Sequence, residues 1–235
     1  MPTSASAVTA AELRRFTLFA GLDDGIAERL CTQVRALHLN RGEVVVEYRS
    51  TTTNVFLLLE GQLLANRFSA SGQEVGYRRL RLHSYFGELA AFDSAPRSVN
   101  IVTLTEARVG SITAPAFNAM IADVPGVARA LLTDMAQTIR ELSNRLFEAS
   151  AVSVPGRVEA ELTRMALAQG LSEDGDFIDN MPTHAELATL IGGQRETVTR
   201  ALGRLVDLGI VAKQGRGLVI RDFEALLDRT EESGD

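Results

Sequence analysis

The sequence predicts an α+β fold with three successive parts: a roll of short β-strands, one long helix, and a winged helix-turn-helix. Short β-rich runs separated by turn residues fill about the first 110 residues after a short helical start. An apolar heptad pattern follows between residues 128 and 149. Farther on, two glycines join a pair of short helical patterns, and a hairpin pattern comes after them. These observations divide the chain into residues 1–125, 126–153 and 154–235.

The roll is predicted from short runs rich in β-branched and apolar residues. The runs are Val44–Val46, Val55–Leu59 and Ser98–Leu104, and the turn residues between them include Asn40–Gly42, Glu60–Gly61 and Ser71-Gly72. Many short strands at this spacing favour a barrel or a double-sheet roll. Helices are expected on either side of these strands, over Asp23–Val34 and from Pro115 onward.

The long helix carries an apolar seam whose members are spaced alternately by four and three residues. They are Ala128, Leu132, Met135, Ile139, Leu142, Leu146 and Ala149. This spacing is typical of a helix that pairs with a second copy, so the seam predicts a homodimer. A long helix packed on its own roll is the alternative. Pro155-Gly156 then interrupts the pattern and predicts a hinge and a domain boundary.

The C-terminal part has the pattern of a helix-turn-helix. Residues 183–191 precede Gly192-Gly193, and a second helix opens with Arg195, Glu196 and, one turn later, Arg200. Arginine suits the O6 and N7 atoms of guanine, and glutamate can accept from cytosine N4, so this helix is predicted to enter the major groove of double-stranded DNA. A helix pair that only packs against protein is the alternative.

Three further side chains around the turn can bond phosphates and fix the register on DNA, namely Thr183, Gln194 and Thr197. Residues 210–212 and 218–220, with Gln214–Gly217 between them, predict a hairpin wing. The chain has a net charge of −6, but residues 194–221 hold six basic and two acidic side chains. Charge distribution matters more than the sum for nucleic-acid binding, although a solvated basic face would show the same pattern.

Several classes of protein are not expected. No run of about 18 apolar residues predicts a membrane span, and Met1–Ala10 lacks the pattern of a signal peptide. The single Cys31 excludes an internal disulfide and an iron–sulfur cluster, so a cytoplasmic location is expected. The three histidines lack metal-ligand spacing, and no catalytic cluster or P-loop is present. Neither a metal nor an enzyme activity is therefore predicted.

A second candidate site lies upstream, in residues 86–98. Gly87 lets the backbone approach a ligand, and Glu88-Leu89-Ala90 can open a helical turn whose free N–H groups favour an anion. Arg97 offers a planar fork for a phosphate and Ser98 adds a hydroxyl. This set suits a nucleotide whose phosphate and ribose face one pocket. A buried Glu88–Arg97 ion pair in a structural loop is the alternative.

Phe86–Ala90 followed by Pro96–Ser98 resembles the phosphate-binding cassette of cyclic-nucleotide-binding domains. Over about residues 14–225 the chain resembles the catabolite activator protein, or Crp/Fnr, family of transcriptional regulators. The resemblance implies a cyclic-nucleotide-binding β-roll, a dimerisation helix and a winged helix-turn-helix. It also implies cyclic AMP as the allosteric effector, with cyclic GMP still open, and RNA polymerase as a further partner. Haem at His83, as in some gas-sensing relatives, is a weaker alternative.

The resemblance also implies roles for single residues. Glu88 would bond the ribose 2′-hydroxyl, while Arg97, Ser98 and nearby backbone amides would hold the cyclic phosphate. The dimer helix of the family touches the base through a Thr-Ser pair, which matches Leu142 and Ser143 here, so only the serine is kept. Arg195 and Arg200 would read guanines and Glu196 the opposing cytosine of a TGTGA-like half-site in a palindrome. A regulator of another signal, or a nucleotide-binding module that binds protein, are the rival interpretations.

Overall fold

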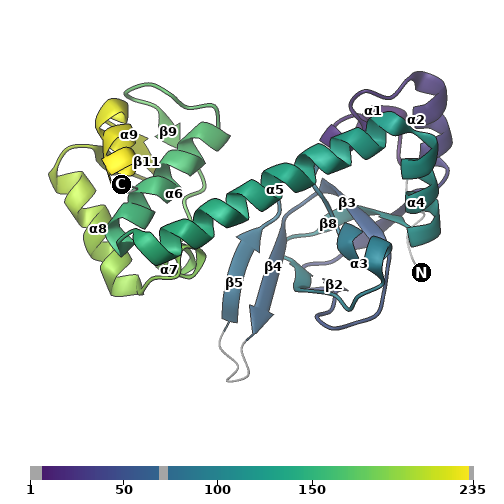
Figure 1. Ribbon diagram of the computed structural model, residues 1–235, viewed down its shortest axis with the longest axis horizontal. Helices are drawn as coiled ribbons and strands as arrows, with labels where there is room; N and C mark the ends of the chain where they lie inside the picture. The colour runs from purple at the N-terminus through teal and green to yellow at the C-terminus, as the bar shows by residue number, and fades with distance from the viewer. Residues whose placement is uncertain (1–6, 69–73, 233–235) are drawn as a thin grey trace. The chain divides into compact units, whose positions relative to one another are not determined.

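The computed structural model describes residues 7–68 and 74–232, so the expected turn at Ser71-Gly72 lies outside the described residues (Figure 1). The chain forms two compact units, residues 1–137 and 138–235. Within the described ranges, no helix is both long enough and apolar enough to cross a membrane. The predicted α+β class is confirmed, with strands and short helices first, one long helix next, and a helix-turn-helix last.

The first unit begins with short helices and contains eight strands in the described residues. The helices are α1 (Ala10–Leu13), a 3-10 helix (Thr17–Phe19), α2 (Asp24–Cys31), α3 (Glu88–Asp93), α4 (Ala114–Asp123) and the start of α5 (Pro125–Ala151). The strands are β1 (Arg35–Leu39), β2 (Val44–Val46), β3 (Val55–Glu60), β4 (Leu63–Phe68), β5 (Glu74–Arg79), β6 (Tyr85–Phe86), β7 (Asn100–Thr103) and β8 (Ala107–Ile112).

These strands form two antiparallel sheets of a roll, with orders β1-β8-β3-β6 and β2-β7-β4-β5. Strand β3 shows why its sequence is apolar at five consecutive positions. Successive side chains of a strand point to opposite faces. Val55, Leu57 and Leu59 join the core beneath the helices, whereas Phe56 and Leu58 join the core of Phe86 and Ile101. Because both faces of β3 are covered, no polar alternation remains.

The N-terminal helix is attached to this roll by a buried charge. Thr9 caps α1 in a capping box with Glu12, and the Glu12 carboxylate also accepts a hydrogen bond from the Arg108 guanidinium on β8. That guanidinium lowers the pKa of Glu12 to about 2. Because Arg108 is only 5% exposed, the pair anchors α1 over the sheet that β8 shares with β3.

The second unit contains the end of α5, the helix-turn-helix and a small sheet. Its other helices are α6 (Val154–Ala168), α7 (His184–Ile191), α8 (Arg195–Asp207) and α9 (Phe223–Glu232). Its strands are β9 (Phe177–Ile178), β10 (Val211–Gln214) and β11 (Gly217–Ile220), in the order β10-β11-β9. The predicted wing is thus present as β10 and β11, while β9 and α9 have no counterpart in the sequence predictions.

The break between α5 and α6 falls earlier in the chain than Pro155-Gly156. Helix α5 ends at Ala151 and α6 begins at Val154, so Pro155 and Gly156 lie in the first turn of α6. Proline is favoured there because its missing N–H would have no partner in that turn. The side chain of Ser153 caps α6 by accepting from the Gly156 N–H. The predicted interruption is therefore a helix start, and the linker is Val152-Ser153.

Charged side chains join the last turns of α5 to α6 within the second unit. Arg164 of α6 donates to Glu148 of α5 at 2.6 Å, and Arg145 of α5 lies 3.3 Å from the buried Glu161 of α6. Arg164 also pairs with Glu161. Arg157 donates to the Ala149 carbonyl at 2.9 Å. This network fixes the direction in which α6 leaves α5, because each helix supplies both signs of charge.

Most of the predicted apolar seam of α5 faces solvent. Leu132, Ile139, Leu142 and Leu146 are 61–70% exposed, whereas Met135 packs partly against the core of the first unit. Exposed leucines and isoleucines at heptad spacing are typical of a surface that another helix covers.

Candidate functional site

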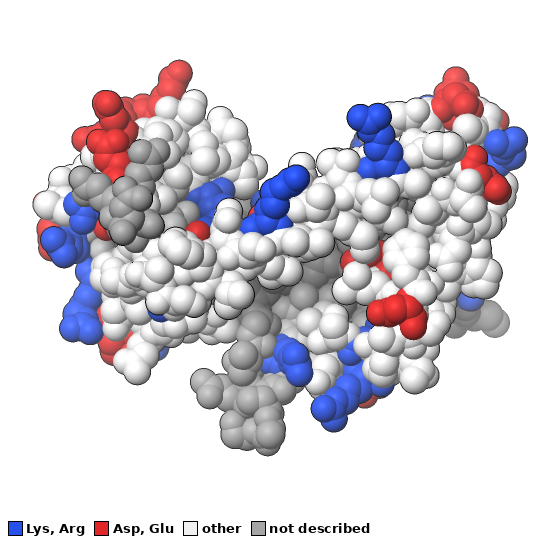
Figure 2. Space-filling view, in the orientation of Figure 1, with Lys and Arg blue, Asp and Glu red and all other residues white. Residues whose placement is uncertain are grey.

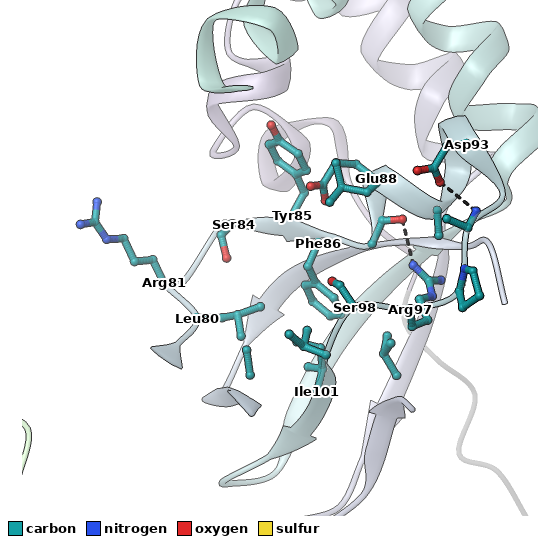
Figure 3. A pocket seen from close by; sticks show the side chains of 18 residues that line it. Leu80, Arg81, Ser84, Tyr85, Phe86, Glu88, Asp93, Arg97, Ser98 and Ile101 are labelled. Carbon is teal, nitrogen blue, oxygen red and sulfur yellow. Dashed lines mark hydrogen bonds between the residues drawn. The ribbon is translucent and has the colours of Figure 1, made fainter. Parts of the chain in front are cut away.

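The first unit contains a cavity of about 400 Å³ beside α3. The predicted phosphate-site residues Gly87, Glu88, Leu89, Ala90, Arg97 and Ser98 all line it. Another part of the wall is apolar and is made by Val46, Ala65, Leu80, Val99 and Ile101. Figure 3 shows Arg97 and Ser98 next to each other on one loop segment and Glu88 on the helical turn above them. The cavity thus combines a cationic group, an anionic group and an apolar surface.

Arg97 is almost completely buried, at 4% exposure, and three hydrogen bonds hold its fork. Nε donates to Thr52 Oγ1 at 3.1 Å, and Nη2 donates to the Asn54 carbonyl at 2.6 Å. Nη1 donates to the Gly87 carbonyl at 2.9 Å (Figure 3). A guanidinium has five N–H donors, so this arrangement leaves two for an anion. All three acceptors are neutral, so the positive charge of Arg97 is retained at the cavity wall.

The alternative of a structural Glu88–Arg97 ion pair does not describe this geometry. Among the residues that the structure describes, no salt bridge joins the two side chains within 4.0 Å. Burial lowers the pKa of Arg97, and the charge of Glu88 opposes that shift. The two charges therefore influence each other without forming a salt bridge.

Gly87 is needed for both its conformation and its size. It caps α3 with φ 88° and ψ 6°, in the left-handed region that disfavours residues with a Cβ. A Cβ there would lie 2.5 Å from Arg97 Nη1 and 2.9 Å from the Asn54 carbonyl oxygen. Glycine at this position therefore lets the guanidinium approach the start of α3.

Glu88 follows as the first residue of α3, and its environment favours the neutral acid. Burial raises its pKa most, and the charge of Asp134 on α5 adds to the rise. Its own backbone N–H, the charge of Arg97 and the Gly87 N–H act in the opposite direction. A charged carboxylate in this position gains from a hydroxyl donor, which a ribose can supply.

Sequence reasoning missed the residues that hold Arg97 in place. Thr52 and Asn54 lie more than forty positions upstream, in the polar run Thr51–Asn54 just before β3. A polar run that leads into a fully buried strand was the available signal. Tyr85, which also lines the cavity, was missed as well.

The helix-turn-helix is built from ordinary helix-end signals. Thr183 and Glu186 form a capping box at the start of α7, and Gly192 ends that helix at φ 66°. A Cβ on Gly193 would lie 2.9 Å from Val154 Cγ1, so a glycine lets the turn pack closely on α6. His184 and Thr199 join α7 and α8 by a 2.8 Å hydrogen bond, which the sequence did not indicate.

The second helix, α8, presents the predicted DNA-reading residues to solvent. Gln194, Arg195, Glu196 and Arg200 are exposed, as is Thr183 before α7, while Thr197 is half-buried. The opposite face holds the core residues Val198, Ala201, Leu202 and Leu205. No salt bridge within the described ranges occupies Arg195 or Arg200. Figure 2 shows basic side chains over α8 and acidic side chains over α9.

Ser143, the expected base contact, lies on the other unit from the cavity-lining residues. It belongs to the part of α5 in residues 138–235 and is exposed, next to the exposed Leu142. The cavity itself is lined by residues of the first unit.

A first prediction concerns Gly87→Ala, with Gly42→Ala as the matched control. Both glycines have positive φ, but a Cβ on Gly42 would meet nothing within 4 Å. We expect Gly42→Ala to cost about 1–2 kcal/mol of unfolding free energy from backbone strain alone, with ligand binding retained. Gly87→Ala should cost about 1–3 kcal/mol more and displace the Arg97 fork. Urea unfolding and anion binding measure both effects; equal behaviour of the two variants would contradict the assignment.

A second prediction concerns the pH dependence that Glu88 produces. The pKa of Glu88 is raised in the folded state. Ionisation of this carboxyl group therefore lowers the free energy of unfolding as pH rises from the ordinary pKa of 4.5 through the raised one. We therefore expect Glu88→Gln to melt at a higher temperature than the wild type at pH 7, with the difference shrinking near pH 4. Glu141→Gln, which changes an exposed glutamate, is the control. A difference independent of pH would contradict this account.

Comparisons with known proteins agree with both halves of this architecture. Residues 36–124 match the family model of the cyclic nucleotide-binding domain, and residues 156–229 match that of the Crp-like helix-turn-helix domain. The CRP-like cAMP-activated global transcriptional regulator of Mycobacterium tuberculosis is 30% identical over 218 residues, which cover 92% of this chain and 97% of that protein. The cyclic AMP receptor protein of Thermus thermophilus is 30% identical over 174 residues, covering 74% and 77% of the two chains.

Solved structures show the same fold. The catabolite activator protein of Thermus thermophilus superposes with a TM-score of 0.53 at 25% identity, covering 92% of this chain and 99% of that one. A variant of CooA from Carboxydothermus hydrogenoformans reaches a TM-score of 0.76 at 13% identity, covering 96% and 97%. With a cyclic nucleotide-binding domain, a Crp-like helix-turn-helix and a full-length relative at this identity, the chain belongs to the Crp/Fnr family of DNA-binding transcriptional regulators.

Proposed function

We propose that this chain is a cytoplasmic homodimeric regulator that cyclic AMP switches to bind a palindromic, TGTGA-like DNA site, where it acts on RNA polymerase. The observation that carries the proposal is the cavity of the first unit. There a buried Arg97 that forms no ion pair with a described residue and a half-buried Glu88 line one cavity from different segments.

A cyclic nucleotide supplies a partner for each kind of surface in this cavity. The cyclic phosphate takes the two remaining N–H groups of Arg97, together with Ser98 and the backbone amides of Gly87, Leu89 and Ala90. The ribose 2′-hydroxyl donates to Glu88. The purine lies along the apolar wall of Leu80, Val99 and Ile101. Two relatives at 30% identity are named for cyclic AMP, which supports it over cyclic GMP.

The exposed heptad seam of α5 supports homodimer formation through that helix. Leu142 and Leu146 are 61% and 70% exposed, and covering them with a second copy of the helix removes apolar surface from water. The proposal includes Ser143 as a contact to the base, as the family resemblance implies. Leucine at the preceding position favours a second candidate, a regulator of the same family that answers to another signal.

For the DNA, Arg195 and Arg200 read guanines and Glu196 reads the opposing cytosine. Thr183, Gln194 and Thr197 bond phosphates. The exposure of Arg195, Glu196 and Arg200 on one end of α8 supports these roles, because side chains near the N-terminus of a recognition helix reach base edges. A two-fold dimer then requires a palindrome with half-sites about one helical turn apart.

Calorimetry with cyclic AMP and cyclic GMP, with and without a palindromic duplex, tests the proposal. We expect cyclic AMP to bind and the duplex to tighten that binding, since linkage is reciprocal. Sedimentation should show two protomers on each duplex. Arg97→Ala should abolish the heat of nucleotide binding, with circular dichroism reporting that the fold is kept. Duplex binding with no heat from either nucleotide would instead favour the second candidate, a regulator of another signal.

Arg200→Ala tests the reading of bases, with Arg204→Ala as a control that removes the same charge from the same helix. We expect Arg200→Ala to cost about 1–3 kcal/mol on the preferred site and to relax preference at one base pair. Arg204→Ala should weaken binding to all DNA sequences by a similar factor, which is smaller than the loss in Arg200→Ala on the preferred site. Binding measured across single-base variants of the half-site separates the two results. A uniform loss with Arg200→Ala would make that residue a phosphate contact.

A further inference from the structure

Three polar side chains from three different elements interact beside the cavity, and the first two of them belong to residues that line it. They are Tyr85 on β6, Glu88 at the start of α3, and Asp134 on α5, all in the first unit. The Tyr85 hydroxyl donates to Asp134 Oδ2 at 3.0 Å. Figure 3 shows the Tyr85 and Glu88 side chains on the same side of the backbone, with Phe86 on the other. Tyr85 is thus one of the residues that line the cavity, and its hydroxyl binds α5.

The charges of these groups act on one another. The charge of Asp134 raises the pKa of Glu88, after burial, and the charge of Glu88 adds to the burial and the Asp134 contact that raise the pKa of Tyr85. Two carboxylates thus repel each other with a phenol next to both. A ligand hydroxyl donated to Glu88 would draw that carboxylate toward the ligand and relieve its repulsion with Asp134.

Asp134 lies near the point where α5 leaves the core of the first unit, so its bond to Tyr85 can affect the placement of α5. Val127 and Leu131 are buried against the core of the first unit, and Met135 is partly buried there. Beyond them the seam residues Ile139 and Leu142 are exposed. Asp134 follows Val127 and Leu131 on the same helical face, so its bond to Tyr85 lies where α5 makes its last contacts with the roll.

We propose that Tyr85 is a positioning residue that couples filling of the cavity to the placement of α5, through its hydrogen bond to Asp134. This inference rests on the proposed function, in which a nucleotide ribose binds Glu88. Ligand binding at Glu88 draws the still-charged carboxylate toward the ligand and away from Asp134, which leaves Asp134 to the Tyr85 hydroxyl. The Tyr85–Asp134 bond then draws α5 to the β6 wall and so favours the DNA-binding conformation.

Tyr85→Phe tests the proposal, because it keeps the aromatic ring and removes only the hydroxyl that binds Asp134. Tyr48→Phe is the matched control, since that hydroxyl accepts from Arg67 on the exposed surface and does not line the cavity. The quantity to measure is the coupling factor, the duplex Kd without cyclic AMP divided by the Kd with saturating cyclic AMP. Loss of a hydrogen bond to a carboxylate should reduce this factor about tenfold or more in Tyr85→Phe. Tyr48→Phe should match the wild type.

The partner side chain sharpens the test. Asp134→Asn keeps an oxygen that accepts from Tyr85, so it should retain more coupling than Asp134→Ala. In the double variant Tyr85→Phe/Asp134→Ala, the coupling factor should fall no further than in either single variant, because all three lack the same bond. Hydrogen exchange gives a DNA-free readout. Cyclic AMP should slow exchange of the amides of residues 126–137 in the wild type but not in Tyr85→Phe.

The outcomes separate the two proposals. Coupling in Tyr85→Phe within about twofold of the wild type, or additive losses in the double variant, would overturn the role of Tyr85 and leave the proposed function intact. A wild-type protein that binds neither nucleotide, or binds duplex and nucleotide independently, would overturn the proposed function itself and this inference with it.

Discussion

The cavity of this protein depends on one buried guanidinium that has no buried counter-charge. Arg97 ties its own segment to two others, because it donates to Thr52 and the Asn54 carbonyl in the run before β3 and to the Gly87 carbonyl before α3. A buried cation costs free energy unless its hydrogen bonds are made. Three neutral acceptors therefore fix the geometry of the wall without removing its charge. The same arrangement requires glycine at position 87, because a side chain there would displace the Arg97 guanidinium from the cavity wall.

Glu88 places a negative charge at the same cavity, also without a salt bridge from any residue that the structure describes to neutralise it. Glu88 is half-buried, and its partial burial together with the charge of Asp134 outweighs the favourable charge of Arg97, so its pKa is raised. A fold selected for stability alone would let the two charges meet. Keeping them apart leaves each with unused hydrogen-bonding capacity that a ligand with both an anion and a hydroxyl can satisfy. Recognition and stability are therefore opposed at this position, which is common where a site is built into a roll that is otherwise well packed.

Much of this architecture could be predicted from local patterns. The apolar run of β3, the heptad spacing of α5 and the paired glycines before α8 each reflect a local rule of periodicity or chain reversal. The parts that escaped prediction depend on contacts between distant residues. Thr52 and Asn54 meet Arg97 across 45 and 43 positions, and Tyr85 meets Asp134 across 49. The two-residue strand β9 is too short to carry a periodic pattern, and Pro155 was read as an interruption although the first turn of a helix accepts it.

Helix α5 belongs to both units and is attached to each by a different kind of interaction. In the first unit, Val127 and Leu131 are buried and the Tyr85–Asp134 bond follows them. In the second, Arg145 and Glu148 pair with Glu161 and Arg164 of α6. Apolar burial tolerates small shifts, because it depends on area more than direction. Hydrogen bonds and bidentate ion pairs depend on direction. Directional contacts therefore define the orientation of α5 against β6 in the first unit and against α6 in the second, each within its own unit.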